Sequence, residues 1–330
     1  MDAKAAFTAS FDTLKKNKIV IAPFAISTVV LIILVFLYLQ ISGTIAVLNK
    51  AVNLAEQYYE AKSEYVFNNY NLSDTNYTVE ALSFFTGRGE YREGLVDYLE
   101  NNGVFDDFLE LMNTRNIIFG VSLIIIGILL SIYLSCASYA AVMLSTKKVK
   151  ITYGNVTSIA NKFFLRLIGV TILVAIIFIL PLVLIGGAAF FLLGINRWIG
   201  LLAIIGFIVF LFYYIILMAI RLLFVYPLLF YENASIKESI TKAFAMTKGS
   251  FRQLLIVFGI IYGISTLTGS IGFSPLYESF YNLFLSESFI ASSILIMLIL
   301  FFIVIWAVVS AFQTMFLFYS YIYFKKPRGE

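Results

Sequence analysis

The chain has 330 residues, of which 61% are hydrophobic and 13% charged, and its mean hydropathy is +0.94. A soluble domain is nearer one half apolar and one quarter charged, so this composition excludes an ordinary soluble protein. The sequence holds no histidine and one cysteine, Cys136, which excludes histidine-based catalysis, a disulfide framework and cysteine-based metal sites. We therefore expect an all-α integral membrane protein without a cofactor or a metal ion.

Six apolar stretches each reach the length of about 18 residues that marks a transmembrane helix. The first is too long for the apolar region of a cleavable signal, and no small-residue cleavage site follows it, so we expect it to remain in the protein. The pattern predicts a multi-pass helical bundle of about six spans. These spans lie at roughly 19–41, 117–144, 167–193, 198–225, 253–271 and 289–324.

Residues 42–115 form the one long polar segment, with twelve acidic residues against five lysines and arginines. Its apolar residues recur at three- and four-residue intervals, and aromatic residues are too frequent for a disordered loop. We therefore predict three parts. An amphipathic helix and the first span occupy 1–41, a small acidic helical cap occupies 42–115, and the remaining five-span membrane domain occupies 116–330.

The distribution of positive charge predicts the orientation of the chain. Seventeen of the 23 lysines and arginines fall in the N-terminal segment, residues 145–166, residues 221–253 and the C-terminal tail. A six-span arrangement places these four segments on one side, which the positive-inside rule assigns to the cytoplasm. We expect a cell-membrane protein with both termini in the cytoplasm and the acidic cap outside.

A short amphipathic segment precedes each odd-numbered span, at roughly 3–16, 155–166 and 235–248. This order predicts three hairpins, each made of a cytoplasmic interfacial helix, a span out and a span back. The three units agree in hydropathy and charge order rather than in residue identity. True repeats and an ordinary six-span protein with basic inner loops are both open.

The stretch 221–255 carries the strongest local signals. Ser235 and Glu238 form an S-x-x-E capping box, Ser250 and Gln253 suggest a second box, and Gly249 suits the position that follows a helix end. A proline in this stretch predicts a break after the fourth span. The candidate site is this elbow between two spans, whose residues are Arg221, Pro227, Glu232, Asn233, Lys237, Lys242, Lys248, Gly249 and Arg252.

Two interpretations of the elbow are open. Its lysines face anionic lipid headgroups on the cytoplasmic side, or its short helix packs as a structural element without lipid selectivity. Arg221 is expected to form a clasp with Glu232 or Glu238, and a substrate-binding arginine is the alternative.

The elbow also resembles a known family of membrane domains. It is similar to the multi-pass domain associated with glycerophosphoryl diester phosphodiesterases, which also occurs as stand-alone prokaryotic proteins. The likeness covers about 30 residues, and the histidine that the phosphodiesterase domain uses is missing from this sequence. The resemblance therefore implies a membrane architecture without enzymatic activity. The residues that carry it are Pro227, Leu228, Glu232, Asn233, Ser239, Ala243, Thr247, Lys248, Gly249 and Phe251.

No nucleotide-binding, metalloprotease or nucleophile motif is present, and no acidic residue lies deep in a span. The leading hypothesis is a non-enzymatic scaffold or adaptor that contacts anionic lipid inside and a protein partner at the outer cap, with no nucleic-acid partner. A transporter or lipid-handling protein with a cavity between the hairpins is the alternative, and an intramembrane enzyme is a weaker third. The sequence indicates no oligomeric state.

Overall fold

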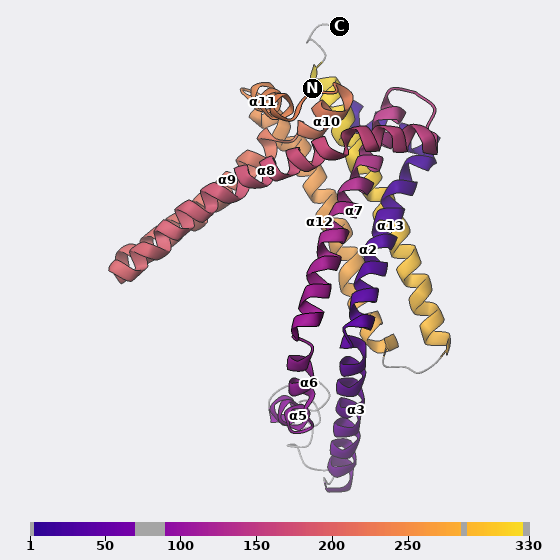
Figure 1. The fold of residues 1–330 in the computed structure, drawn as a ribbon, viewed down its shortest axis with the longest axis vertical. Helices are drawn as coiled ribbons and strands as arrows, with labels where there is room; N and C mark the ends of the chain where they lie inside the picture. Colours follow the sequence, from indigo (N-terminus) through magenta and orange to yellow (C-terminus); the bar gives the residue numbers. More distant parts are fainter. Residues whose placement is uncertain (1–2, 70–89, 285–288, 326–330) are drawn as a thin grey trace. The chain divides into compact units, whose positions relative to one another are not determined.

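The computed structural model describes residues 3–69, 90–284 and 289–325 of the chain. These residues are almost entirely helical and contain no β-strand, which confirms the all-α fold class. The elements in chain order are α1 (Ala3–Lys16), the 3₁₀ turn η1 (Lys18–Val20), α2 (Ile21–Ile41), α3 (Thr44–Asn69), α5 (Glu90–Asn101), α6 (Val104–Glu110), α7 (Thr114–Thr146), α8 (Tyr153–Ile195), α9 (Arg197–Arg221), α10 (Val225–Tyr231), α11 (Ile236–Thr247), α12 (Phe251–Phe284) and α13 (Phe289–Lys325) (Figure 1).

Five helical segments of the described chain are long and apolar enough to cross a membrane. A sixth is possible if α11 and the first part of α12, which meet at a bend of 113°, count as one span. This range agrees with the prediction of about six spans. The five segments are Lys18–Ile41, Thr114–Thr146, Tyr153–Ile195, Arg197–Tyr231 and Met297–Lys325.

The chain divides into two compact units. The larger unit contains residues 1–29 and 129–330, and the smaller unit contains residues 30–128. Both divisions fall inside predicted spans, so the polar segment shares its unit with the adjoining parts of α2 and α7.

In the smaller unit, α3, α5 and α6 pack against one another. The rings of Tyr58 and Tyr98 lie 5.4 Å apart between their centroids, and Lys50 pairs with Asp107 at 2.6 Å. The side-chain amide of Asn116, in the first turn of α7, donates to the backbone carbonyls of Ser42 and Leu111 at 3.1 Å each. These bonds join the start of α7 to the turn before α3 and to the end of α6. The described part of the predicted cap is therefore helical, and its placement outside the cell stays a prediction.

The core of the larger unit is built around the short helix α10. Four of its residues besides Pro227 are buried, and Phe230 is 1% exposed. The Tyr139 ring from α7 lies 5.1 Å from Tyr226 and 5.3 Å from Phe230, and the Phe163 ring from α8 lies 4.8 Å from Phe230. Aromatic contacts from two long helices therefore fix the position of α10 and of the turn that follows it.

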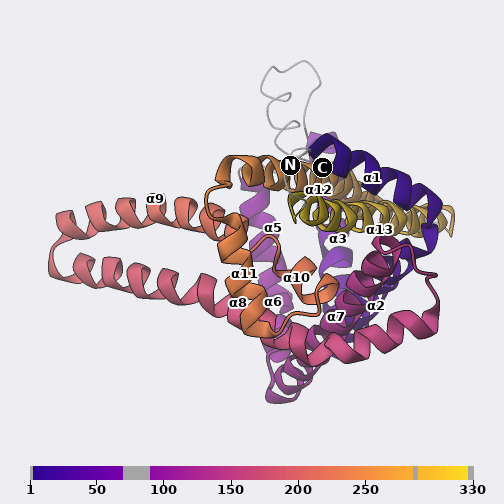
Figure 2. The same ribbon diagram turned by 90° about the horizontal axis from the view of Figure 1, so that it is seen from above.

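Other helices of this unit pack in pairs. Helices α8 and α9 run side by side, as do α12 and α13 (Figure 2). Helix α1 lies along α13 and buries Ala6, Ser10 and Leu14, which recur every four residues and so share one face. Phe11 stays 58% exposed, although its spacing groups it with Leu14 in the sequence.

Candidate functional site

The break between the fourth span and the elbow comes before the proline. Helix α9 ends at Arg221, and α10 begins at Val225, so that Pro227 is the third residue of α10. In the first turn of a helix a backbone N–H has no partner within the helix, and a proline there costs little. The predicted break is present and lies just before Pro227, whose ring excludes a helical hydrogen bond to the carbonyl of Leu223, four residues earlier.

The local signals around α11 are confirmed. The Ser235 hydroxyl accepts from the backbone N–H of Glu238, and the Glu238 carboxylate accepts from the N–H of Ser235, at 3.3 Å each. Gly249 has a φ of +81°, the left-handed conformation expected just after a helix end. The predicted second box is not formed by side chains: only the backbone carbonyl of Ser250 takes part, accepting from the N–H groups of Gln253 and Leu254.

Glu232 connects the elbow to the last helix. Its carboxylate accepts hydrogen bonds from the Tyr321 hydroxyl and the Lys325 ammonium group of α13, and Lys242 of α11 lies 3.6 Å away. Burial raises the pKa of Glu232, but the hydrogen bonds from Lys325 and Tyr321 and the charges of Lys325 and Lys242 outweigh it, so the pKa lies below its ordinary value. The side chain stays ionised at neutral pH although only 18% of it is exposed.

The residues on either side of Glu232 are also held by cations. Lys147, just beyond α7, donates to the Tyr231 carbonyl at 3.1 Å and lies 4.6 Å from the centroid of the Tyr231 ring. Arg166 of α8 donates to the Asn233 side-chain oxygen at 2.9 Å. Consecutive residues of the elbow thus receive cations from three separate parts of the chain.

Arg221 does not form the predicted clasp, and that prediction is wrong. Glu232 pairs with Lys325 and Lys242, while Glu238 pairs with Lys242 at 2.7 Å. The Arg221 guanidinium instead lies 5.8 Å from the centroid of the Phe244 ring. The last turn of α13 brings Lys325 onto the carboxylate, and nothing local in the sequence indicates that approach.

The remaining predicted site residues lie mainly on the surface of the elbow. On α11, Ser239, Ile240, Ala243 and Thr247 are buried, and the helix contacts α8, α9 and α10. The opposite side of α11 and the start of α12 expose cationic side chains. The exposed members of the predicted site are Asn233, Lys237, Lys242, Lys248, Gly249 and Arg252.

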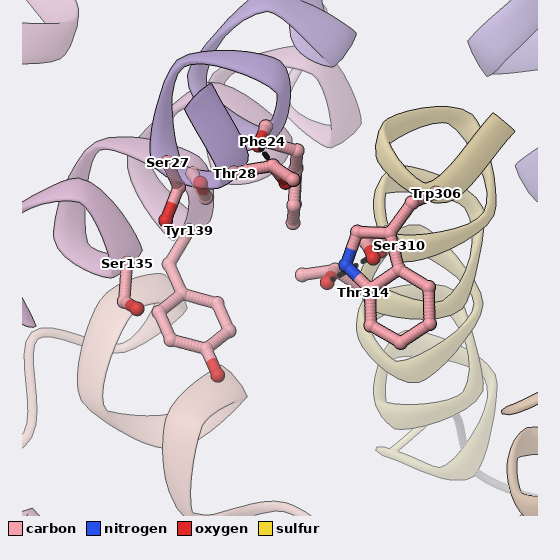
Figure 3. A pocket seen from close by; sticks show the side chains of 9 residues that line it. Phe24, Ser27, Thr28, Ser135, Tyr139, Trp306, Ser310 and Thr314 are labelled. Atoms are coloured by element: carbon pink, nitrogen blue, oxygen red, sulfur yellow. Dashed lines mark hydrogen bonds between the residues drawn. The ribbon is translucent and has the colours of Figure 1, made fainter. Parts of the chain in front are cut away.

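A small hollow of about 120 Å³ lies among the spans of the larger unit, between α2, α7 and α13 (Figure 3). The hydroxyls of Thr28, Ser138 and Thr314 donate to backbone carbonyls four residues earlier in their own helices. The hollow has room for a few water molecules and not for a phospholipid. Its lining residues are Phe24, Ser27, Thr28, Ser135, Ser138, Tyr139, Trp306, Ser310 and Thr314.

The side chains of the elbow limit the chemistry that it can carry out. Its one largely buried carboxylate, Glu232, is already bound by a tyrosine and a lysine. Within the described ranges, no group of three or more acidic or thiol side chains is placed to hold a metal ion. The arrangement can bind anions through its exposed cations.

No family model matches the chain, and no curated protein or solved structure matches it. The likeness of the elbow to the phosphodiesterase-associated membrane domains stays a prediction.

Asn233 offers a direct test of the elbow turn, because its φ of 56° is costly for most side chains. We expect Asn233→Ala to lower the free energy of unfolding by about 1–2 kcal/mol. Asn233→Gly, which also lacks the acceptor for Arg166, should be less destabilised because glycine adopts positive φ readily. Thermal unfolding in detergent measures both variants, and an alanine variant as stable as the glycine variant would contradict the interpretation.

Proposed function

We propose that this chain is a non-enzymatic scaffold or adaptor of the cell membrane that binds anionic lipid headgroups at its elbow. The observation that carries the proposal is the division of α11 into a protein-packed face and an exposed face, on which Lys237 and Lys242 outnumber the single carboxylate of Glu238. Because the packed face already contacts α8, α9 and α10, α11 has no broad apolar face left to insert into lipid. Its lysines remain exposed to a membrane surface.

The exposed cations are available for this role. No ion pair within the described chain engages Lys237, Lys248 or Arg252. A cation near an anionic membrane surface contributes about 1 kcal/mol to binding. Lys242 contributes less in this proposal, because it already neighbours two carboxylates.

The bend between α11 and α12 supports an interfacial position for the elbow. If α12 crosses the membrane, a bend of 113° sets α11 close to the membrane plane. In the same proposal the bundle consists of three hairpins, each preceded by an interfacial helix, and both termini are cytoplasmic. The acidic helices of the smaller unit then lie outside, where they meet a protein partner.

We also propose membership in the family of membrane domains associated with glycerophosphoryl diester phosphodiesterases. Three motif residues support it by their positions in the elbow: Pro227 in the first turn of α10, Asn233 with positive φ, and Gly249 after α11. These are backbone roles that a conserved architecture needs.

The lipid proposal predicts that the protein retains more anionic than zwitterionic phospholipid when it is purified from a mixed bilayer in neutral detergent. The triple substitution Lys237→Ala, Lys248→Ala and Arg252→Ala should reduce this excess, because about 1 kcal/mol per cation is lost. Mass spectrometry of the bound lipid measures the ratio. Arg197→Ala, at the start of α9, is the control for the loss of a single cation outside the elbow and should change the ratio less than the triple variant. Equal retention of both lipids by the wild type would refute the proposal.

A further inference from the structure

A second hollow, of about 720 Å³, lies in the larger unit where the end of α1, the turn between α7 and α8, and α13 come together. Its volume is within the range of ordinary ligand pockets, about 300–1,000 Å³. None of the predicted elbow residues lines this hollow. Its lining residues are Asp12, Thr13, Lys16, Asn17, Ile19, Ser145, Lys148, Val149, Lys150, Ile151 and Tyr319.

The lining carries an excess of positive charge. Lys16, Lys148 and Lys150 oppose the single carboxylate of Asp12. Among the described residues no ion pair neutralises any of these four side chains. The hollow therefore attracts anions, and Asp12 limits how strongly it does so.

Hydrogen bonds between the elements hold the wall of the hollow in place. The hydroxyls of Thr13 and Tyr319 lie 2.7 Å apart, which ties α1 to α13. The Asn17 amide donates to the Ser145 hydroxyl at 3.2 Å, which ties the residue after α1 to the end of α7. The lysines thus project from elements whose mutual positions are fixed.

The hollow lies at the end of the membrane-spanning segments. One candidate span begins at Lys18, another ends at Thr146, and a third begins at Tyr153. Ile19 and Val149 line the hollow and are 55% and 47% exposed. Cations beside exposed apolar side chains at this level match the headgroup and the first methylene groups of a phospholipid.

We propose that this hollow binds the phosphate group of an anionic phospholipid through Lys16, Lys148 and Lys150. The inference rests on the proposed function for the presence of anionic lipid at this side of the membrane. It adds a defined site, separate from the cations of the elbow, and names the chemistry of its ligand.

The test is a titration of the detergent-solubilised full chain with short-chain phosphatidylglycerol, phosphatidylcholine and inorganic phosphate, followed by the shift in Tm or by native mass spectrometry. Wild type should bind phosphatidylglycerol most tightly. The double variant Lys148→Ala with Lys150→Ala should bind it at least about tenfold more weakly, and Asp12→Asn several-fold more tightly. Lys162→Ala removes one exposed lysine of α8 outside the lining and is the control for the loss of a cation elsewhere, so it should bind like wild type.

The Asp12→Asn variant keeps the test independent of misfolding, because an unfolded protein cannot bind phosphatidylglycerol more tightly than wild type. Inorganic phosphate that binds as tightly as phosphatidylglycerol would overturn the lipid as the source of the phosphate. In one contrary outcome, the double variant binds phosphatidylglycerol like wild type while the elbow triple variant loses the preference for anionic lipid. That pair of results would overturn this site and leave the proposed function standing. Lysine-dependent phosphate binding without any anionic preference in bilayers would support the anion site and refute the proposed function.

Discussion

Replacing Phe230 by alanine is expected to lower the free energy of unfolding by about 3–5 kcal/mol. Phe230 is 1% exposed, and the rings of Phe163 and Tyr139 lie within 4.8 Å and 5.3 Å of its own ring. Removal of the ring leaves a cavity at the point where α7 and α8 meet α10. Because these helices are long and held by many other contacts, they cannot collapse fully into that space. Chemical unfolding in detergent, followed by circular dichroism, measures the loss.

The matched control is Phe212→Ala on α9, because Phe212 is 63% exposed and has the same side chain. It should stay within about 0.5 kcal/mol of wild type. Equal stability of the Phe230→Ala variant and wild type would show that α10 is not the centre of the core. A large loss in the Phe212→Ala variant would show instead that the exposed face of α9 is covered in the folded protein.

The helices themselves were predictable because their signals are local. Apolar length marks the spans, the Ser235–Glu238 capping box marks the start of α11, and Gly249 marks its end. Each of these signals lies within one continuous stretch of the chain. The structure confirms them for that reason.

The proline predicted a break between α9 and α10, but the sequence did not indicate the residues at which the turn occurs. Leu222, Leu223 and Phe224 are all compatible with a continuous helix, and the sequence offers Pro227 as the only local breaker. The side chain of Phe224 is fully buried, with the rings of Tyr321 and Phe324 at 5.6 Å and 5.4 Å. Packing against α13 accompanies the turn, and packing between distant segments leaves no local signature.

The partners of the elbow were missed for the same reason. Glu232 and Lys325 are 93 positions apart, Tyr231 and Lys147 are 84 apart, and Asn233 and Arg166 are 67 apart. Sequence reasoning favoured Arg221 as the partner of Glu232 because it is near in the chain. Glu232 and Asn233 were predicted as site residues, but which cations reach them depends on how the helices pack.

The contacts of Glu232 lead to the second large effect. Glu232→Ala should lower the free energy of unfolding by about 2–4 kcal/mol, because charge-assisted hydrogen bonds are lost and the fully buried Tyr321 is left without its acceptor. Glu232→Gln keeps an acceptor oxygen for Tyr321 and loses only the charge, so it should fall between alanine and wild type. Thermal and chemical unfolding in detergent rank the three proteins.

The stabilisation by Glu232 should depend on pH in one direction. In the folded protein the pKa of Glu232 lies below its ordinary value of about 4.5. The Glu232 carboxylate therefore stabilises the fold fully above pH 4.5, and this stabilisation is lost as the pH falls through the lowered pKa. The difference in stability between wild type and Glu232→Gln should therefore be constant from pH 6 to 8 and shrink below about pH 4. Glu238→Gln is the matched control, since its carboxylate is exposed and glutamine still completes the capping box. A Glu238→Gln variant as unstable as Glu232→Gln, or a difference that grows on acidification, would exclude Glu232 as the ionic link between the elbow and α13.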